Sequence, residues 1–532
     1  MSDLGQLRQL LVAYFSESEL MTLTFDLGMD YEMLPGSTKG DKARELVAYL
    51  WRRGRLADLT SVGRELRPQV AWPDVAQIAS PETTETAAKM PDSDGVAAPA
   101  MTSANPFTYG NPISDPDRFF GRSREIEQVF NRLRNAEAES SSIVGGRRIG
   151  KSSLLNYLAH PDIRRRHGMD PERSIFVYVD LQMVDEQTTP ARLWQGLLSR
   201  MARQSRDESL NARLREIISA GEFDNFTLAD LFDAVDSSTR HVVFLLDEFE
   251  TVTSNPNFDP GFFYGLRSLA IQHNLSLVTS SRHELIELTH SQAVRSSPFF
   301  NIFANINLRL FNETESGRLL HGLLDETGVE FTEEELAALA DIAGGHPFFL
   351  QAAGHFLFSA HAAHADATRR RAAWLKAFST EVGPHLAHFW RTTDPPGQIS
   401  LLLLALLSRQ AGGRPFIEPD RIESLYPRAG QSLGRLARLG YVAEDAGRFA
   451  IFSTAFSDWI VAEMRTGGQI APPTAPEAAT GQALARMPTG RQAAMGTLLN
   501  RVAAGYQPLL VELVAQSGDP EQTLQLLLER LV

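Results

Sequence analysis

The chain has 532 residues, 43% of them hydrophobic, and a formal net charge of −14. This length predicts several domains with sizeable apolar cores. The absence of cysteine excludes disulfides and thiolate metal sites, and the acidic balance argues against broad binding to nucleic acid or anionic membranes. The apolar runs are too short to span a bilayer, and the first residues lack the basic start of a signal peptide, so we expect a cytoplasmic protein.

Residues 1–72 are predicted to form a helical module, because apolar residues recur at helical spacing in residues 4–15 and again in residues 42–53. Its charges are segregated along the chain. The acids are Glu17, Glu19, Asp26, Asp30 and Glu32, and the later bases are Lys39, Lys42, Arg44, Arg52, Arg53 and Arg55. A module with one acidic and one basic side is suited to head-to-tail docking. A solvated surface whose charges happen to cluster is the alternative.

The pattern LLVAYFSESELMTLTFDLGMDYEMLPG, followed by KARELVAYLWRRGRLADL, resembles the bacterial effector-associated, death-like adaptor domains. That resemblance implies a helical bundle used for homotypic docking, without catalysis. Residues 73–104 follow and are rich in Pro, Ala, Thr and Ser, which predicts a flexible tether.

The stretch SSIVGGRRIGKSSLL contains the phosphate-loop pattern G-x-x-x-x-G-K-[ST]. Glycines let backbone N–H groups approach a phosphate, and the following helix points its positive end at the same group. Lys151 adds a charge, and the Ser152 hydroxyl is a suitable ligand for Mg²⁺. A chance glycine-rich turn is the alternative. The predicted nucleotide-binding residues here are Gly145, Gly146, Arg147, Arg148, Ile149, Gly150, Lys151, Ser152 and Ser153.

A second motif, HVVFLLDEFE, reads as a buried strand that ends in two acids. Asp247 is predicted to bind Mg²⁺ together with Ser152, and Glu248 to polarise an attacking water. A strand that simply ends in polar residues is the alternative for this motif alone. Together with the phosphate loop, it predicts a site for ATP or GTP.

The segment NPFTYGNPISDPDRFFGRSREIEQVFNRL precedes the loop and, with both motifs, resembles the STAND class of P-loop ATPases, which are relatives of AAA+ proteins. The resemblance implies that Phe120, Gly121 and Arg122 lie against the adenine, with core packing as the alternative for the aromatics. It implies that Arg282, at the end of the predicted strand LSLVTSSR, senses the γ-phosphate, with a surface arginine as the alternative. It also implies that Pro347 packs near the base. The predicted catalytic residues are Lys151, Asp247, Glu248 and Arg282.

Residues 395–465 predict a winged helix, with helices followed by a two-stranded wing. Eight bases and seven acids between Arg409 and Arg465 nearly balance, whereas a DNA-binding domain should be clearly basic on one face. The STAND resemblance implies that this domain clamps the nucleotide, often through a histidine. Ser453 occupies the matching place in this sequence.

We therefore expect a multidomain protein. It comprises an all-α adaptor bundle, an α/β P-loop core with a parallel sheet, a helical lid, a winged helix and a short helical tail. The predicted boundaries are 1–72 for the adaptor, 73–104 for the tether, 105–290 for the nucleotide-binding core, 291–392 for the lid, 393–466 for the winged helix, 467–484 for a second linker and 485–532 for the tail.

The predicted function is an ATP-dependent signalling switch that uses ATP/ADP and Mg²⁺. Its predicted partners are further copies of the chain and an effector or adaptor with a matching death-like domain. The resemblance implies a role in bacterial conflict or defence. The alternatives are a DNA-binding AAA+ ATPase of the origin-recognition type, which the charge balance disfavours, and a scaffold that binds nucleotide without turnover.

Overall fold

The computed structural model describes most of the chain. The described residues are 3–27, 39–52, 56–67, 70, 72–73, 104–135, 138–325, 327–411, 413–467, 484–485 and 487–531. They belong to two compact units, one formed by residues up to 102 together with 383–388, the other by the remaining residues. Nearly all of both predicted tethers lies outside the described residues. Among the described helices, none has the length and apolar character that a membrane crossing requires.

The first unit is helical, as predicted. Its helices are α1 (Asp3–Tyr14), α2 (Glu17–Asp26), α3 (Lys39–Arg52) and α4 (Leu56–Leu66). Leu7 and Leu11 of α1 lie one turn apart and are fully buried, as are Leu46 and Leu50 of α3, so the helical periodicity of the sequence builds this core.

The predicted charge segregation of the first unit is untested. The side chains of Glu17, Asp26 and Arg52, and all of Asp30, Glu32, Arg53 and Arg55, lie outside the described residues. Two further residues of the predicted charge pattern, Glu19 and Lys39, interact within the unit. Glu19 pairs with Arg67, and the Lys39 ammonium donates to the Phe15 carbonyl oxygen at 3.0 Å.

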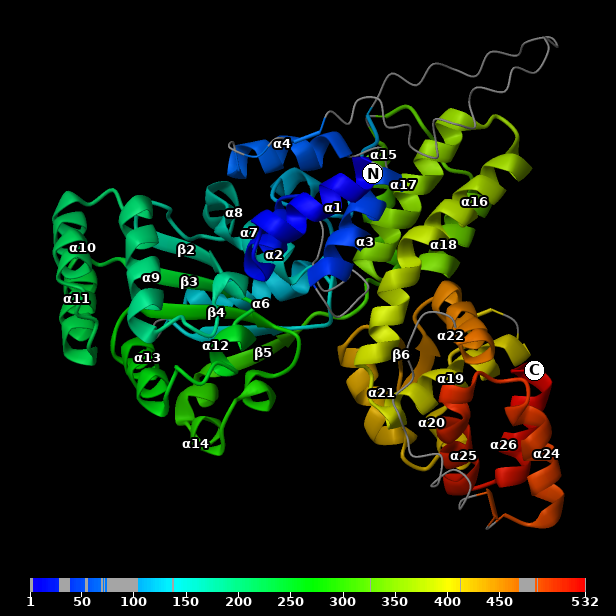
Figure 1. The fold of residues 1–532 in the computed structure, drawn as a ribbon. Helices are drawn as coiled ribbons and strands as arrows, with labels where there is room; N and C mark the ends of the chain where they lie inside the picture. The colour runs from blue at the N-terminus through cyan, green and yellow to red at the C-terminus, as the bar shows by residue number, and fades with distance from the viewer. Residues whose placement is uncertain are drawn as a thin grey trace, which may run out of the picture. The chain divides into compact units, whose positions relative to one another are not determined.

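A five-stranded, fully parallel sheet forms the centre of the second unit (Figure 1). The strands are β1 (Ser140–Val144), β2 (Ser174–Asp180), β3 (His241–Asp247), β4 (Leu275–Ser281) and β5 (Phe303–Asn307), in the spatial order β2-β3-β4-β1-β5. This order places the end of β4 between the ends of β1 and β3. Strand β5 pairs with β1 and lies beyond residue 290, the predicted end of the core.

Helices cover both faces of the sheet, which is why β1, β3 and β4 are almost entirely buried. On β3, Val242, Phe244 and Leu246 belong to one core, and Val243 and Leu245 belong to the other. The first core is completed by α9 (Pro190–Gln204), α10 (Glu208–Ala220), α11 (Asn225–Ser237) and α13 (Pro260–Gln272), and the second by α6 (Ser123–Leu133), α7 (Lys151–Ala159) and α8 (Pro161–Arg166). The short elements are η3 (Pro116–Arg118), η4 (Leu181–Met183), α12 (Glu250–Thr253), η5 (Leu285–Leu288), α14 (Gln292–Arg295) and η6 (Pro298–Ile302).

The rest of the second unit is mainly helical. The predicted lid region contains α15 (Glu313–Leu324), α16 (Glu333–Ala343), α17 (Pro347–Ala363) and α18 (Ala367–Thr392), although residues 383–388 of α18 are grouped with the first unit. Then come α19 (Pro395–Ala411), α20 (Pro419–Leu425), α21 (Ala429–Arg438), the antiparallel hairpin of β6 (Val442–Asp445) and β7 (Arg448–Ile451), and α22 (Thr454–Thr466). The tail holds α24 (Thr489–Leu499), η7 (Ala504–Tyr506), α25 (Gln507–Gln516) and α26 (Pro520–Arg530). Helices followed by a small hairpin match the order expected of the winged helix, and the predicted fold class is confirmed.

Candidate functional site

The predicted phosphate loop connects the carboxyl end of β1 to the start of α7. Gly150 has a φ of 102° and forms the N-cap of α7, a conformation that glycine adopts without strain. Arg148 also has a positive φ, of 60°. In the described part of the chain, no side chain caps the first turn of α7, so the N–H groups at this helix end have no side-chain acceptor there. The turned backbone and uncapped helix end suit a phosphate.

Lys151 is the first residue of α7 and is 5% exposed. Its ammonium donates to the carbonyl oxygens of Gly145 and Gly146, at 3.0 and 3.1 Å. These bonds turn the side chain back across its own loop, so its charge is held beside the backbone that the sequence assigns to phosphate.

Asp247 ends β3, is 2% exposed, and has a hydrogen-bond donor on each carboxylate oxygen. The Tyr178 hydroxyl donates to Oδ2 at 3.0 Å, and the Ser280 hydroxyl donates to Oδ1. Burial and the charge of Asp247 raise the pKa of Tyr178, so Tyr178 stays protonated and remains a donor. Each carboxylate oxygen has a second lone pair, so this oriented aspartate could bind a hard cation such as Mg²⁺, and the Ser152 hydroxyl is also a ligand of the type that Mg²⁺ prefers.

Glu248 is half-buried and has a φ of 53°, which is uncommon for a residue other than glycine. Its backbone N–H donates to the Ser280 hydroxyl at 3.1 Å, which ties this turn to the end of β4. Burial raises the pKa of the Glu248 carboxyl to about 7. The positive charge of Lys151 lowers this pKa, and the negative charge of Glu250 raises it further. A carboxyl that titrates near neutrality is suited to proton transfer.

Arg282 follows β4 and lies between the phosphate loop and the acids, because β4 lies between β1 and β3. Its Nε and its backbone N–H both donate to Oε1 of Glu250, each at 3.1 Å. The Arg282 side chain is 46% exposed, whereas that of Glu250 is 6% exposed.

The residues predicted to contact adenine lie between the phosphate loop and the lid region. Arg122 is 3% exposed and donates to the carbonyl oxygens of Ile149, at 3.0 Å, and Arg309, at 2.6 Å. The ring of Phe120 lies over α15, where a Cβ at Gly322 would be 2.3 Å from it. Arg122 thus links the loop to the chain that enters the lid.

The segment between α21 and β6 lies directly on the phosphate loop. A Cβ at Gly146 would be 2.0 Å from the Leu439 carbonyl oxygen, and a Cβ at Gly440 would be 3.2 Å from the Ile149 side chain. Burial lowers the pKa of Arg147 to about 10, and its charge acts on Tyr441. The loop, the lid region and the hairpin therefore meet around Gly146.

Pro347 is the first residue of α17, as its position after two glycines predicts. The preceding His346 is fully buried among aromatic rings, with centroids of Phe349 and Phe452 at 5.1 and 5.7 Å, and burial lowers its pKa to about 3. The Ser453 hydroxyl accepts from the Phe456 N–H at 3.0 Å and caps α22.

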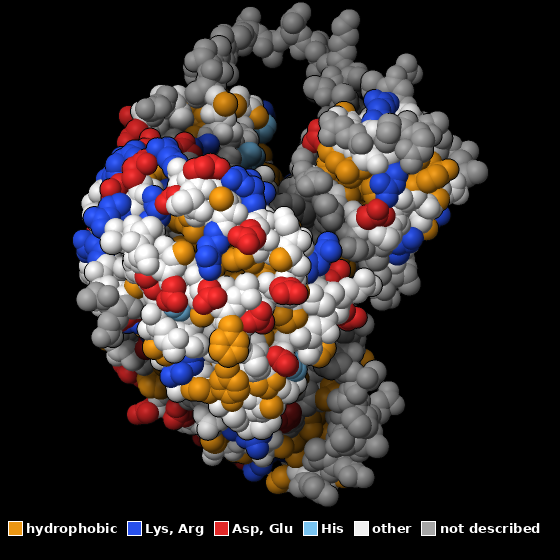
Figure 2. Space-filling model, turned by 90° about the vertical axis from the view of Figure 1, so that its left-hand side faces the viewer, with side chains coloured by type: hydrophobic (Ala, Val, Ile, Leu, Met, Phe, Trp, Pro, Cys, Tyr) orange, Lys and Arg blue, Asp and Glu red, His pale blue; other side chains and the backbone are white. Residues whose placement is uncertain are grey.

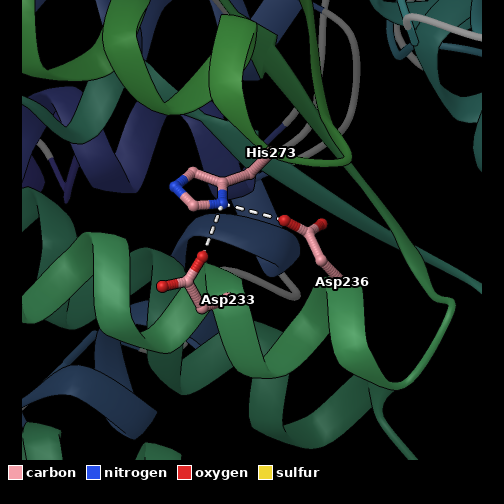
Figure 3. Close-up of side chains that lie close together, drawn as sticks. All are labelled: Asp233, Asp236 and His273. Atoms are coloured by element: carbon pink, nitrogen blue, oxygen red, sulfur yellow. Dashed lines mark hydrogen bonds and ion pairs between the residues drawn. The ribbon is translucent and has the colours of Figure 1, made fainter.

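A separate cluster joins Asp233 and Asp236 of α11 to His273 after α13 (Figure 3). The Nδ1 atom of His273 lies 2.8 Å from Asp236 and 3.6 Å from Asp233. A histidine that binds a metal through one nitrogen normally donates from the other. Its Nε2 is buried and has no hydrogen-bond partner in the described part of the chain. This cluster is therefore better explained as a link between two helices than as a metal site.

Folding brings the phosphate loop, Asp247, Glu248 and Arg282 together at one end of the sheet, and the roles assigned to these residues stay predictions. Sequence reasoning missed Tyr178, Ser280 and Glu250. Glu250 stands two residues after the paired acids and Ser280 two before Arg282, so proximity to the motifs was the available signal. Tyr178 offered none, because only the pairing of β2 with β3 brings it to Asp247.

Comparisons with known proteins agree with the two resemblances. Residues 134–390 match the family model Novel STAND NTPase 2, and residues 7–68 match Effector-associated domain 7. No curated protein matches the chain.

Solved structures with partial similarity include a Walker-type ATPase of Pyrococcus abyssi, 16% identical, which covers 66% of this chain and 98% of its own with a TM-score of 0.44. The Aeropyrum pernix ORC2 protein is 16% identical, with coverages of 65% and 96% and a TM-score of 0.42. The Thermotoga maritima RuvB branch-migration motor is 12% identical, with coverages of 65% and 97% and a TM-score of 0.32. None of these likenesses bears on the function of this chain. The family matches, together with the parallel core and its phosphate loop, show that the chain contains a Novel STAND NTPase 2 domain, which is a P-loop NTPase domain, and an N-terminal effector-associated domain 7.

Proposed function

We propose that this NTPase is a signalling switch in which binding and hydrolysis of ATP control docking of the effector-associated domain. The observation that carries the proposal is the contact of Leu439 and Gly440 with the phosphate loop. A nucleotide at this loop is bound next to the segment that joins α21 to the hairpin, so its phosphates can bias how closely that segment packs.

In this proposal the amides of the loop and Lys151 bind the phosphates, and Arg282 senses the γ-phosphate. Ser152 and Asp247 hold Mg²⁺, which supplies charge neutralisation at the phosphates. Glu248 accepts a proton from the attacking water. Tyr178 and Ser280 keep the Asp247 carboxylate oriented by donating to it. Hydrolysis then resets the switch.

The output of the switch is docking of the effector-associated domain to further copies of itself or to an effector with a matching domain. Exposed ion pairs contribute only about 0–1 kcal/mol each, so a single docking contact is weak. Copies gathered by an oligomeric NTPase raise the effective concentration of their partners and make weak contacts sufficient.

The test is the mass distribution of the full chain, measured by mass photometry with Mg²⁺ and either ADP or a non-hydrolysable ATP analogue. We expect larger assemblies with the analogue than with ADP. A mass distribution that ignores the nucleotide, although both nucleotides bind, would contradict the proposal.

A second test addresses docking. Reversing Arg52 and Arg53 to Glu should abolish nucleotide-dependent assembly of the full chain but leave ATP hydrolysis unchanged. Mixing with a Glu17→Lys, Asp30→Lys variant should restore part of the assembly. Glu19 is unsuitable for this swap, since it pairs with Arg67 and caps α2 through Ser16.

The surface gives the DNA-binding alternative no support on the face that carries α10 and α11. Acidic and basic side chains are interspersed over most of that face (Figure 2). Salt-dependent retention of the full chain on duplex DNA would support the DNA-binding alternative.

A further inference from the structure

Glu250 is an acidic residue beside the candidate site to which sequence reasoning assigned no role. It begins α12, two residues after Glu248, and is 5% exposed. Its Oε1 accepts both the backbone N–H and the Nε–H of Arg282, each at 3.1 Å. Its Oε2 is buried and has no hydrogen-bond partner in the part of the chain that the structure describes.

A carboxylate this deeply buried is unfavourable unless it is paired, so the bond to Arg282 must offset a substantial loss of hydration. One oxygen binds the main chain and the side chain of the same arginine, and this fixes both the start of the side chain and the direction of its guanidinium. The Arg282 side chain is 46% exposed, so it would otherwise sample many rotamers.

In the side chain of Arg282, the hydrogen bond to Glu250 is donated by Nε, with Nη1 and Nη2 lying farther along the guanidinium. Those two nitrogens form the end of the guanidinium that binds a phosphate in a fork. Glu250 therefore orients the arginine through its Nε, the guanidinium nitrogen nearest the main chain. The strand order places this arginine between the phosphate loop and the acids.

Resting on the proposed function, we propose that Glu250 is a positioning residue that holds Arg282 in the orientation required for phosphoryl transfer. Its positioning effect acts through Arg282, and Glu250 touches no reacting atom. Its effect therefore depends on where its Oε1 lies, and the same effect must vanish when Arg282 is absent.

Two conservative variants separate placement from charge. Glu250→Gln retains an acceptor at Oε1 and removes the charge. Glu250→Asp retains the charge, but its carboxylate is one methylene shorter. The full-length chain is assayed for kcat and KM of Mg²⁺-dependent ATP hydrolysis, with melting temperature as the folding check and Glu287→Ala, which removes an exposed acid nearby, as the matched control.

We expect Glu250→Asp to lower kcat about tenfold or more with little change in KM, because positioning supports the transition state. Glu250→Gln should stay within about threefold of the wild-type kcat, since its amide oxygen can still accept both bonds. Arg282→Ala should lower kcat by about 10²-fold or more, and adding Glu250→Asp to it should change kcat less than about twofold.

The inference would be overturned by a kcat that is unchanged in Glu250→Asp, whether or not Glu250→Gln is impaired. It would also be overturned if Glu250→Asp lowered kcat by the same factor in the wild-type chain and in Arg282→Ala. Absence of hydrolysis in the wild-type chain would instead refute the proposed function. The two failures are thus distinguishable.

Discussion

Replacing Gly146 by alanine is predicted to separate the phosphate loop from the segment between α21 and β6. The added Cβ would lie 2.0 Å from the Leu439 carbonyl oxygen and 2.9 Å from its carbonyl carbon, whereas ordinary contact begins at 3.4 Å. The Leu439 carbonyl oxygen must therefore move away by about 1.4 Å, which is 3.4 Å minus 2.0 Å. A close-packed interior has no space to absorb the added methyl group. The atoms that the new Cβ would meet are backbone atoms of Leu439, so no side-chain rotation can relieve the clash.

The size of the effect follows from the cost of overpacking, about 1–3 kcal/mol. A cost of this size shifts the equilibrium between the packed and separated arrangements by about 5- to 150-fold. Gly146 is not among the residues of positive φ, so alanine introduces no backbone strain of its own. The Ile149–Gly440 contact beside it should loosen at the same time.

The assay is hydrogen exchange of peptides that cover residues 436–452, in the nucleotide-free full chain. Exchange of these peptides in Gly146→Ala should be about 5- to 150-fold faster than in the wild type. Gly434→Ala is the matched control, because Gly434 lies in α21 and no atom lies within 4 Å of a Cβ placed there. Exchange in Gly146→Ala that equals the wild type would refute the reasoning, as would an equal acceleration in both variants.

Lys151→Ala should weaken ATP binding without unfolding the core, because the loop geometry depends on backbone conformation; calorimetric titration checks this, and unchanged affinity counts against the site. Glu248→Gln should bind ATP normally and hydrolyse it about 10²–10⁴-fold more slowly, measured by phosphate release, and wild-type turnover would exclude the assigned role. Tyr178→Phe removes a donor to Asp247 and should raise the Mg²⁺ concentration needed for half-maximal hydrolysis by roughly 10–100-fold. An unchanged Mg²⁺ requirement would show that Asp247 is held without Tyr178.

The local pattern of apolar and polar residues was sufficient to predict most of the helices and strands. The strands predicted for HVVFLLDEFE and LSLVTSSR formed as β3 and β4. The apolar run of β3 was informative because a parallel strand buried on both faces is usually apolar along its length. Strand β5 was not predicted. Its sequence FANIN alternates with polar residues, and it lies at the edge of the sheet, where burial is incomplete.

The sequence by itself determined the two family resemblances, the fold class and the motifs that are predicted to bind phosphate, since glycines, a lysine and paired acids leave a local signature. Only the tertiary structure decided how these pieces meet. Strand order brings Arg282 between two motifs that are far apart in the chain, and strand pairing brings Tyr178 to Asp247. Burial of Glu250 against Arg282, and the contact of Leu439 with Gly146, were equally invisible in the sequence. The physical reason is that such contacts arise from packing between distant segments, and a residue's type does not disclose which distant neighbour it will have.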